Sequence, residues 1–187
     1  MQLVFDIETD GFLEDMTKCH VLVCQDVVSK KLYTFTDIQN GLDFMKNADA
    51  LIGHNIIGFD LMALDKLYGW KPSSKTVLID TWIMSQTLQF NRQHKHGLAG
   101  WGSYLGFKKM DNSEWAADGF KTYDPRMIDY CINDVKLNTK VYEVLLAELQ
   151  KAIEINDLIK KGLRVEHDVA EFEAVVRKTG WLFDLEK

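Results

Sequence analysis

The order of the expected elements predicts an α/β fold with a mixed five-stranded sheet flanked by helices. Three strand-like segments come first, then helices and short strands alternate, and a long helical pattern follows. Strands joined by tight turns pair antiparallel, whereas strands separated by helices are connected by right-handed crossovers and run parallel. One sheet with an antiparallel beginning and a parallel end is therefore expected.

Short apolar runs mark the strands. The first run is a buried strand interrupted by acidic residues, and Ser29-Lys30 forms a tight connection between the second and third. The remaining two runs are brief and lie between helical patterns. The five expected strands cover residues 2–8, 19–28, 31–36, 50–53 and 76–79.

Capping residues mark the helices. Asp37 and Asp80 are placed to cap helices, and Asp124-Pro125 combines a good N-cap with a residue favoured in the first turn. From Met127 to Leu149 apolar residues recur at helical spacing, which indicates one buried face. The expected helices cover residues 37–46, 59–68, 97–105, 124–150 and a stretch within 163–180. This order of elements fits the ribonuclease H-like architecture.

The bulk composition limits the possible functions. The 187 residues suit one domain, or one domain with a short extension, and 47% are hydrophobic. The net charge of -6 argues against a wide duplex-binding surface but allows nucleic acid held through metal ions. No apolar run is long enough for a membrane span, and no export signal is visible, so a cytoplasmic protein is expected. Its three cysteines are interpreted as reduced thiols.

Two carboxylates interrupt the first strand. Asp6 and Glu8 are two residues apart, so both side chains lie on one face of the sheet. Burying unpaired charge is costly, and a hard cation is the obvious compensation. The alternative is an exposed strand end with two solvated acids.

Three further residues can likewise be interpreted either as part of a metal site or as purely structural. Asp60 opens a helix, where a carboxylate is stabilising by itself. Tyr130 and Asp134 are four residues apart on one helix face and could form a simple hydrogen-bonded pair. Together with Asp6 and Glu8, however, they supply the converging oxygen ligands that two Mg²⁺ or Mn²⁺ ions require.

Three motifs carry a resemblance to a known superfamily. DIETDGF at 6–12, HNIIGFD at 54–60 and YCIND at 130–134 resemble the three exonuclease motifs of the DEDD superfamily, in its tyrosine form. In the histidine form the base would stand at position 129, which is Asp129 here. The chain most resembles the proofreading domain of family A DNA polymerases of the bacteriophage replicative type. Similar segments at 79–85, 96–106 and 114–135 extend the likeness over nearly the whole chain.

The resemblance implies a two-metal-ion 3′→5′ exonuclease that releases nucleoside 5′-monophosphates. Asp6, Glu8, Asp60 and Asp134 would be the metal ligands, with Asp6 as the bridge, and Tyr130 would orient the attacking water. The expected substrate is a single-stranded DNA 3′ end, and the expected partner is a DNA polymerase domain or subunit. A monomer is expected, in the cytoplasm of a bacterial host if the protein is phage-encoded. An RNA-trimming exonuclease and a non-catalytic module remain as alternatives.

Several residues are candidates for DNA contacts. Thr9 and Asn55 lie beside the motif carboxylates, and Phe12 could stack on the terminal base. His96 lies in a Gly- and Lys-rich region that could line the path of the strand. Each has a structural alternative: a backbone-bonding hydroxyl for Thr9, a local turn for Asn55, core packing for Phe12 and a surface role for His96. The same region holds Arg92, Lys95, Lys108 and Lys109.

The C-terminal part resembles the junction to a polymerase domain. Residues 1–162 are expected to form the exonuclease domain, and residues 163–187 a helical extension. Val165, Val169, Phe172, Val175 and Val176 form an apolar stripe that could face a polymerase, or pack on the chain's own domain.

Overall fold

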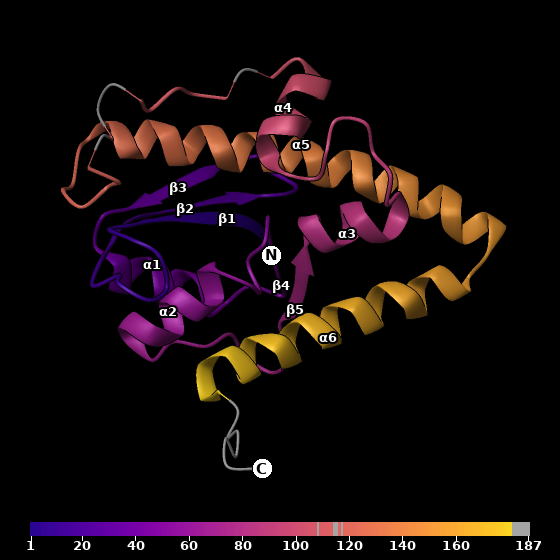
Figure 1. Cartoon of the computed structure of the whole chain (residues 1–187), viewed down its shortest axis with the longest axis horizontal. Helices are drawn as coiled ribbons and strands as arrows, with labels where there is room; N and C mark the ends of the chain where they lie inside the picture. The colour runs from indigo at the N-terminus through magenta and orange to yellow at the C-terminus, as the bar shows by residue number, and fades with distance from the viewer. Residues whose placement is uncertain (108, 114–115, 117, 181–187) are drawn as a thin grey trace, which may run out of the picture.

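A computed structural model describes residues 1–107, 109–113, 116 and 118–180 (Figure 1). Five strands form one sheet in the order β3-β2-β1-β4-β5. β1 pairs antiparallel with β2, and β2 with β3, whereas β1–β4 and β4–β5 are parallel. The predicted mixed sheet is therefore confirmed. The strands are β1 (Gln2–Thr9), β2 (Cys19–Asp26), β3 (Leu32–Phe35), β4 (Ala50–Gly53) and β5 (Val77–Asp80).

The helices begin where the capping residues predict. The Asp37 and Asp80 carboxylates accept hydrogen bonds from first-turn amides of α1 and α3. The Asp124 carboxylate accepts from the amide of Arg126, 2.8 Å away, at the start of α5. The helices are α1 (Ile38–Met45), α2 (Asp60–Tyr68), α3 (Thr81–Leu88), α4 (Leu98–Leu105), α5 (Arg126–Ile155) and α6 (Leu158–Thr179).

The end of α5 differs from the expectation. The helix continues past Gln150 to Ile155, because no helix-breaking residue intervenes before the extended Asn156. α6 then starts at Leu158, so the expected domain division between residues 162 and 163 falls inside one continuous helix. Residues 181–187 of the expected extension lie outside the described residues.

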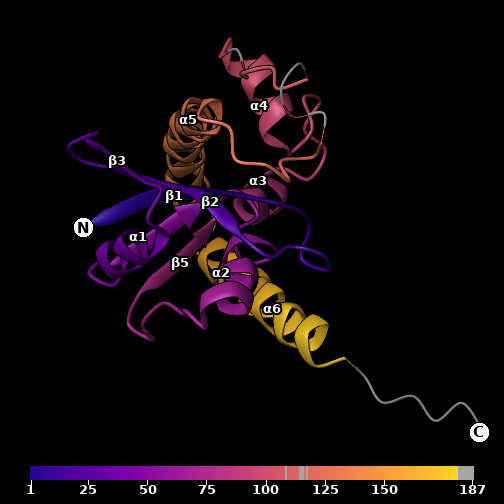
Figure 2. The same cartoon turned by 90° about the vertical axis from the view of Figure 1, so that its left-hand side faces the viewer.

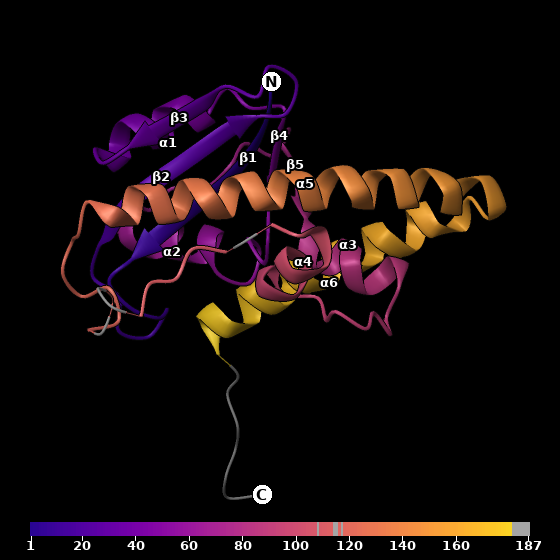
Figure 3. The same cartoon turned by 90° about the horizontal axis from the view of Figure 1, so that it is seen from above.

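Alternate residues of the central strands point to opposite layers of helices. Leu3, Phe5 and Leu51 pack with α1 and α2, whereas Val4 and Ile52 pack with α5. Figure 2 shows α5 on one side of the sheet and α1, α2 and α6 on the other. Because side chains alternate along a strand, Asp6 and Glu8 continue the Val4 row and therefore face α5. Figure 3 shows α5 running across the sheet on this side.

No helix in the described ranges is long and apolar enough to cross a membrane. Cys19, Cys24 and Cys131 are all buried and free, which agrees with their interpretation as reduced thiols.

Candidate active site

The strand β1 presents its carboxylates where it separates from β4. The two strands are paired from Gln2 to Val4, whereas the pairing of β1 with β2 continues to Thr9. Asp6 and Glu8 lie beyond the last β1–β4 pair. The loop that follows β4 and the helix α5 can therefore reach these carboxylates from two directions.

The helix α5 places its motif residues over the same part of β1. The Cys131 thiol lies 3.4 Å from the backbone oxygen of Asp6, which fixes this turn of α5 against the strand. Asp134 is buried and Tyr130 is half-buried, one helical turn apart. Burial is the main cause that raises the pKa of Asp6 and of Glu8, and repulsion from Asp134 raises both further, which shows that the first and third motifs converge.

Asp60 enters the cluster from the first turn of α2, and Asp80 organises the loop before it. The Asp80 carboxylate accepts hydrogen bonds from the amides of Asn55 (2.9 Å) and Ile57 (3.2 Å). Asn55 has a positive φ of 65°, which asparagine tolerates better than most residues. A Cβ on Gly58 would lie 2.5 Å from Oδ1 of Asn55, so a larger residue at position 58 would displace the Asn55 side chain. Asp80 is thus a helix cap, as predicted, that also shapes the second motif.

The four carboxylates stand in an environment that disfavours their charge. Burial, followed by repulsion from Asp60, Glu8 and Asp134, raises the pKa of Asp6 well above its usual range. Burial also raises the pKa of Glu8 and of Asp60 to about 8 in each case. The pKa of Asp134 is raised by burial, while Lys109 acts in the opposite direction. Without a compensating cation, carboxyl groups of this site are therefore partly protonated near neutral pH.

The cluster has the donor set that a hard cation requires. Oδ1 of Asp60 and Oδ1 of Asp134 are both buried without a hydrogen-bond partner among the described residues. Buried polar atoms are rarely left in this state unless an ion or water completes them. Carboxylate oxygens are the ligands that Mg²⁺ and Mn²⁺ prefer. The residues present therefore fit a divalent metal site.

Cys131 and Lys109 join the site, although the sequence motifs assign neither of them a role there. One ligand atom each of Asp6, Glu8 and Cys131 lies within 4.8 Å of the others. Burial raises the pKa of the Cys131 thiol well above its ordinary value, so a protonated donor to Asp6 is favoured over a metal ligand. Cys131 is three residues before Asp134, and this spacing predicts that both side chains lie on the same face of α5.

Lys109 comes from the segment between α4 and α5. Its Nζ lies 2.8 Å from Oδ2 of Asp134 and 5.2 Å from the ring centroid of Tyr130. Burial lowers the pKa of Lys109, but Asp134 and Tyr130 outweigh burial and raise it above its ordinary value. The sequence includes Lys109 only among several basic residues, because no spacing rule links it to Asp134.

The candidate DNA-contact residues lie in different environments. Phe12 is 77% exposed and thus outside the core. Asn55 is exposed beside the cluster, whereas the Thr9 hydroxyl donates to the backbone oxygen of Gly11 at 2.9 Å. Both ring nitrogens of His96 lie within 2.9 Å of protein oxygens, those of Ser85 and Phe90. Arg92 is buried and paired with Glu148, and Lys108 lies outside the described residues.

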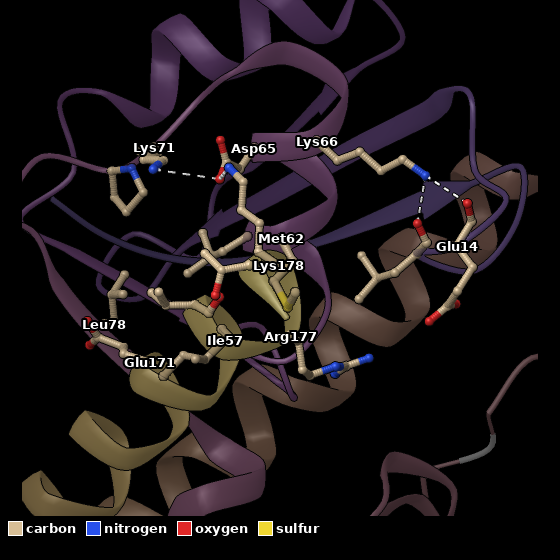
Figure 4. A pocket seen from close by; sticks show the side chains of 16 residues that line it. Glu14, Ile57, Met62, Asp65, Lys66, Lys71, Leu78, Glu171, Arg177 and Lys178 are labelled. Atoms are coloured by element: carbon tan, nitrogen blue, oxygen red, sulfur yellow. Dashed lines mark hydrogen bonds and ion pairs between the residues drawn. The ribbon is translucent and has the colours of Figure 1, made fainter. Parts of the chain in front are cut away.

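A separate cavity of about 1000 Å³ lies between α2 and α6 (Figure 4). Four basic side chains line it, but each has a partner within the protein. Lys66 donates to the backbone oxygens of Leu13 and Glu14, and Lys71 and Lys178 pair with Asp65. Arg177 donates to the backbone oxygen of Gly58. Since none of the four motif carboxylates lines this cavity, it is distinct from the candidate active site.

The architecture belongs to the ribonuclease H-like class of α/β folds. The structure of Brucella melitensis NrnC with bound Mg²⁺ superimposes with a TM-score of 0.71 and 19% identity, over 100% of this chain and 90% of that one. Escherichia coli RNase D, an exoribonuclease involved in structured RNA processing, gives a TM-score of 0.62 and 16% identity, over 91% of this chain and 45% of that one. These likenesses confirm the predicted fold.

At the level of sequence the chain is similar to a phage polymerase. It is 26% identical to the DNA-directed DNA polymerase of Enterobacteria phage T3, over 97% of this chain. It spans about a third (33%) of the length of that relative. No family model matches the chain. The predicted resemblance to the exonuclease domain of phage-type family A DNA polymerases is thereby confirmed.

Proposed function

We propose that this chain is a metal-dependent 3′→5′ exonuclease that acts on DNA 3′ ends. The observation that carries the proposal is the convergence of Asp6, Glu8, Asp60 and Asp134, from β1, α2 and α5, with two buried carboxylate oxygens left without partners in the described part of the chain. Tyr130 stands one helical turn from Asp134, as in the tyrosine form of the DEDD motifs. A set of acids with raised pKa values is costly for folding, and catalysis gives a reason to keep it.

The four carboxylates would hold two Mg²⁺ or Mn²⁺ ions. Such ions, when bound, lower the pKa of a water and stabilise charge on a leaving oxygen. The structure of NrnC with bound Mg²⁺ is a precedent for a divalent ion on this fold. In the ion-free site, the raised pKa values of Glu8 and Asp60 mean that metal binding must release protons.

The protein's own groups would orient the reactants. The Tyr130 hydroxyl would hydrogen-bond the attacking water, and burial raises the pKa of this hydroxyl above the ordinary value of 10.0. It therefore stays protonated at neutral pH and orients the water rather than acting as a base. Attack on the terminal phosphodiester breaks the bond to the 3′ oxygen and releases a nucleoside 5′-monophosphate.

The proposed substrate is a single strand rather than a duplex. The chain carries a net charge of -6, which disfavours a long run of duplex phosphates. Phe12 is largely exposed and is the last residue of the first motif, so it can stack on the terminal base. Asn55 lies exposed on the second motif, where it can contact the sugar or phosphate.

Proofreading for a DNA polymerase is the proposed biological role. This chain matches only about a third (33%) of the length of the phage relative. We propose that residues 1–162 form the exonuclease domain and that residues 163–187 lead toward a polymerase domain or subunit. Deleting residues 163–187 tests this division: the shortened chain should fold and digest DNA, whereas unfolding would place α6 within the exonuclease.

The activity test uses single-stranded DNA labelled at its 5′ end, so that shortening from the 3′ end appears as a ladder. The wild-type chain should produce this ladder with Mg²⁺ or Mn²⁺ and none with EDTA, while Asp134→Ala should be inactive in both. A 3′-labelled strand should release the label as a mononucleotide. Absence of digestion together with no Mn²⁺ binding at millimolar concentration would favour a non-catalytic module.

An RNA-trimming exonuclease is the second candidate, because RNase D has the same fold and is an exoribonuclease. The catalytic residues do not separate the two, since discrimination depends on contacts near the 2′ position. Matched single-stranded DNA and RNA of one sequence should be digested at different rates, with DNA faster. Faster digestion of RNA would replace DNA as the proposed substrate.

A further inference from the structure

Lys109 brings positive charge to the carboxylate cluster from outside all three motifs. Its Nζ lies 2.8 Å from Oδ2 of Asp134, and the side chains of Lys109 and Asp134 are 32% and 7% exposed. The other oxygen, Oδ1 of Asp134, is buried and has no hydrogen-bond partner in the described part of the chain. One oxygen of this carboxylate is therefore held by the protein, while the other remains for a ligand.

The segment that carries Lys109 is fixed to the same helix as Asp134. The amide of Met110 donates to Oδ1 of Asn133 at 3.2 Å, so the residues next to Lys109 and Asp134 are bonded to each other. Earlier in the segment, the Lys140 ammonium of α5 lies 5.7 Å from the ring centroid of Phe107. Residues before and after Lys109 in the sequence therefore both contact α5, and this limits how far the Lys109 ammonium can move from Asp134.

Lys109 also contacts the third motif through its tyrosine. Its ammonium lies 5.2 Å from the centroid of the Tyr130 ring, within the range of a cation–π contact. Tyr130 and Asp134 are one turn apart on α5, and Lys109 therefore contacts both of these side chains of the third motif.

We propose, resting on the function proposed above, that Lys109 is a positioning residue which holds Asp134 and Tyr130 in their working orientation. By binding Oδ2 of Asp134, it leaves Oδ1 directed to a divalent ion. Groups that orient metal ligands in this way typically contribute about 10- to 100-fold to metal affinity or activity.

The position of Lys109 argues against a simple contact to the DNA backbone. A lysine that binds phosphate needs a free, exposed ammonium, and its loss weakens substrate binding. Lys109 is instead engaged with a buried carboxylate and an aromatic ring. Its loss should therefore reduce kcat and metal affinity, with little change in the KM for DNA.

The test compares Lys109→Met with Lys109→Arg and with Lys136→Met. Methionine keeps the length of the side chain and removes its charge, while arginine keeps the charge. Lys136 is exposed on α5, two residues after Asp134, so Lys136→Met makes the same change in net charge away from the site. Mn²⁺ affinity is measured by electron paramagnetic resonance without DNA, and kcat and KM are measured on single-stranded DNA at saturating and limiting Mn²⁺.

Lys109→Met should raise the Kd for Mn²⁺ about 10- to 100-fold and lower kcat at limiting metal, and Lys109→Arg should recover part of both. Lys136→Met should match the wild type. Tighter Mn²⁺ binding in Lys109→Met would overturn the proposal, because the lysine would then compete with the ion. A rise in KM alone would overturn it in favour of a DNA contact.

The metal measurement separates this proposal from the proposed function. If the wild type digests no nucleic acid but Lys109→Met still weakens Mn²⁺ binding, the exonuclease function fails and the positioning of Asp134 stands. If the wild type digests DNA and Lys109→Met changes neither Mn²⁺ affinity nor kcat, the positioning role fails and the function stands.

Discussion

The two long helices α5 and α6 use their apolar residues in opposite ways. α5 buries ten residues, among them Asp134 and Cys131 of the site. α6 buries only His167 among its described residues, although it is also long and carries a valine-rich stripe. Val165, Val169, Phe172 and Val175 of that stripe are 45–61% exposed. Length and hydrophobic periodicity alone therefore do not decide which face of a helix is buried.

The face that α6 turns inward is made of smaller and more polar residues. Leu163, Ala170 and Ala174 pack against the core, and His167 lies on the same face. Its Nε2 accepts the amide hydrogen of Asp80 at 2.9 Å, and its Nδ1 lies 2.8 Å from the backbone oxygen of Leu163. The alanines allow close approach, and a polar anchor sets the position. The larger stripe is left on the opposite side, where a partner could cover it.

The largest expected effect comes from the buried face of α5. Asp134→Ala should abolish DNA digestion, because it removes a metal ligand, and Asp6→Ala should do the same. Melting temperatures without metal should stay level or rise, since each change removes charge from a repelling cluster. A marked fall in melting temperature for both variants would show that the acids stabilise the fold.

Tyr130→Phe should have a smaller effect, since it removes a hydroxyl and no ligand. We expect a loss of up to about 10²-fold in kcat, as for a single positioning or acid–base group. The Kd for Mn²⁺ is the control and should remain unchanged. Full activity of Tyr130→Phe would disprove its proposed role in orienting water.

The stability of the metal-free protein should depend on pH. Glu8 and Asp60 have folded-state pKa values of about 8, far above their ordinary values of 4.5 and 3.8. The folded state then binds more protons than the unfolded state, so stability is lost as pH rises through the folded pKa. Burial lowers the pKa of His54 from 6.5 to about 3, so His54 gives the opposite dependence on pH, mainly below pH 6.5. The measurement therefore covers pH 6.5 to 8.5.

In EDTA, the melting temperature should fall across this window, and Mn²⁺ should restore it at the alkaline end. Asp60→Asn should make the dependence shallower, because one of the carboxyl groups with a raised pKa is gone. A melting temperature that rises with pH in EDTA would contradict the raised pKa values.

The smallest effects compare the two faces of α6. His167→Ala leaves the amide of Asp80 without its partner, and this should cost about 1–3 kcal/mol of stability. Phe172→Ser changes a residue that is 61% exposed and should stay within about 0.5 kcal/mol. Urea denaturation of both variants gives the comparison. Equal losses would show that the exposed stripe of α6 also supports the fold.

Sequence predicts the parts of this molecule that follow local rules. The alternation Asp6–Glu8, the cap at Asp80 and the spacing Tyr130–Asp134 are repeated in the structure, because strand period and helix turn determine them. The ion pair of Lys109 with Asp134 depends on how the segment after α4 folds back on α5, which no local pattern encodes. The sequence likewise does not predict which face of α6 packs inward. The alanines and the histidine on that face give a weaker hydrophobic signal than the valines and phenylalanine of the exposed stripe.

The hydrogen bond between Asp80 and His167 has a consequence for slow motions of the molecule. The Asp80 amide is held by α6, while the Asp80 carboxylate holds the amides of Asn55 and Ile57. These amides should exchange their hydrogens with solvent as one cooperative unit, because lifting α6 frees the strand end that tethers the loop. Deuterium uptake at these amides would then report, in a single measurement, how firmly the last helix closes over the second motif.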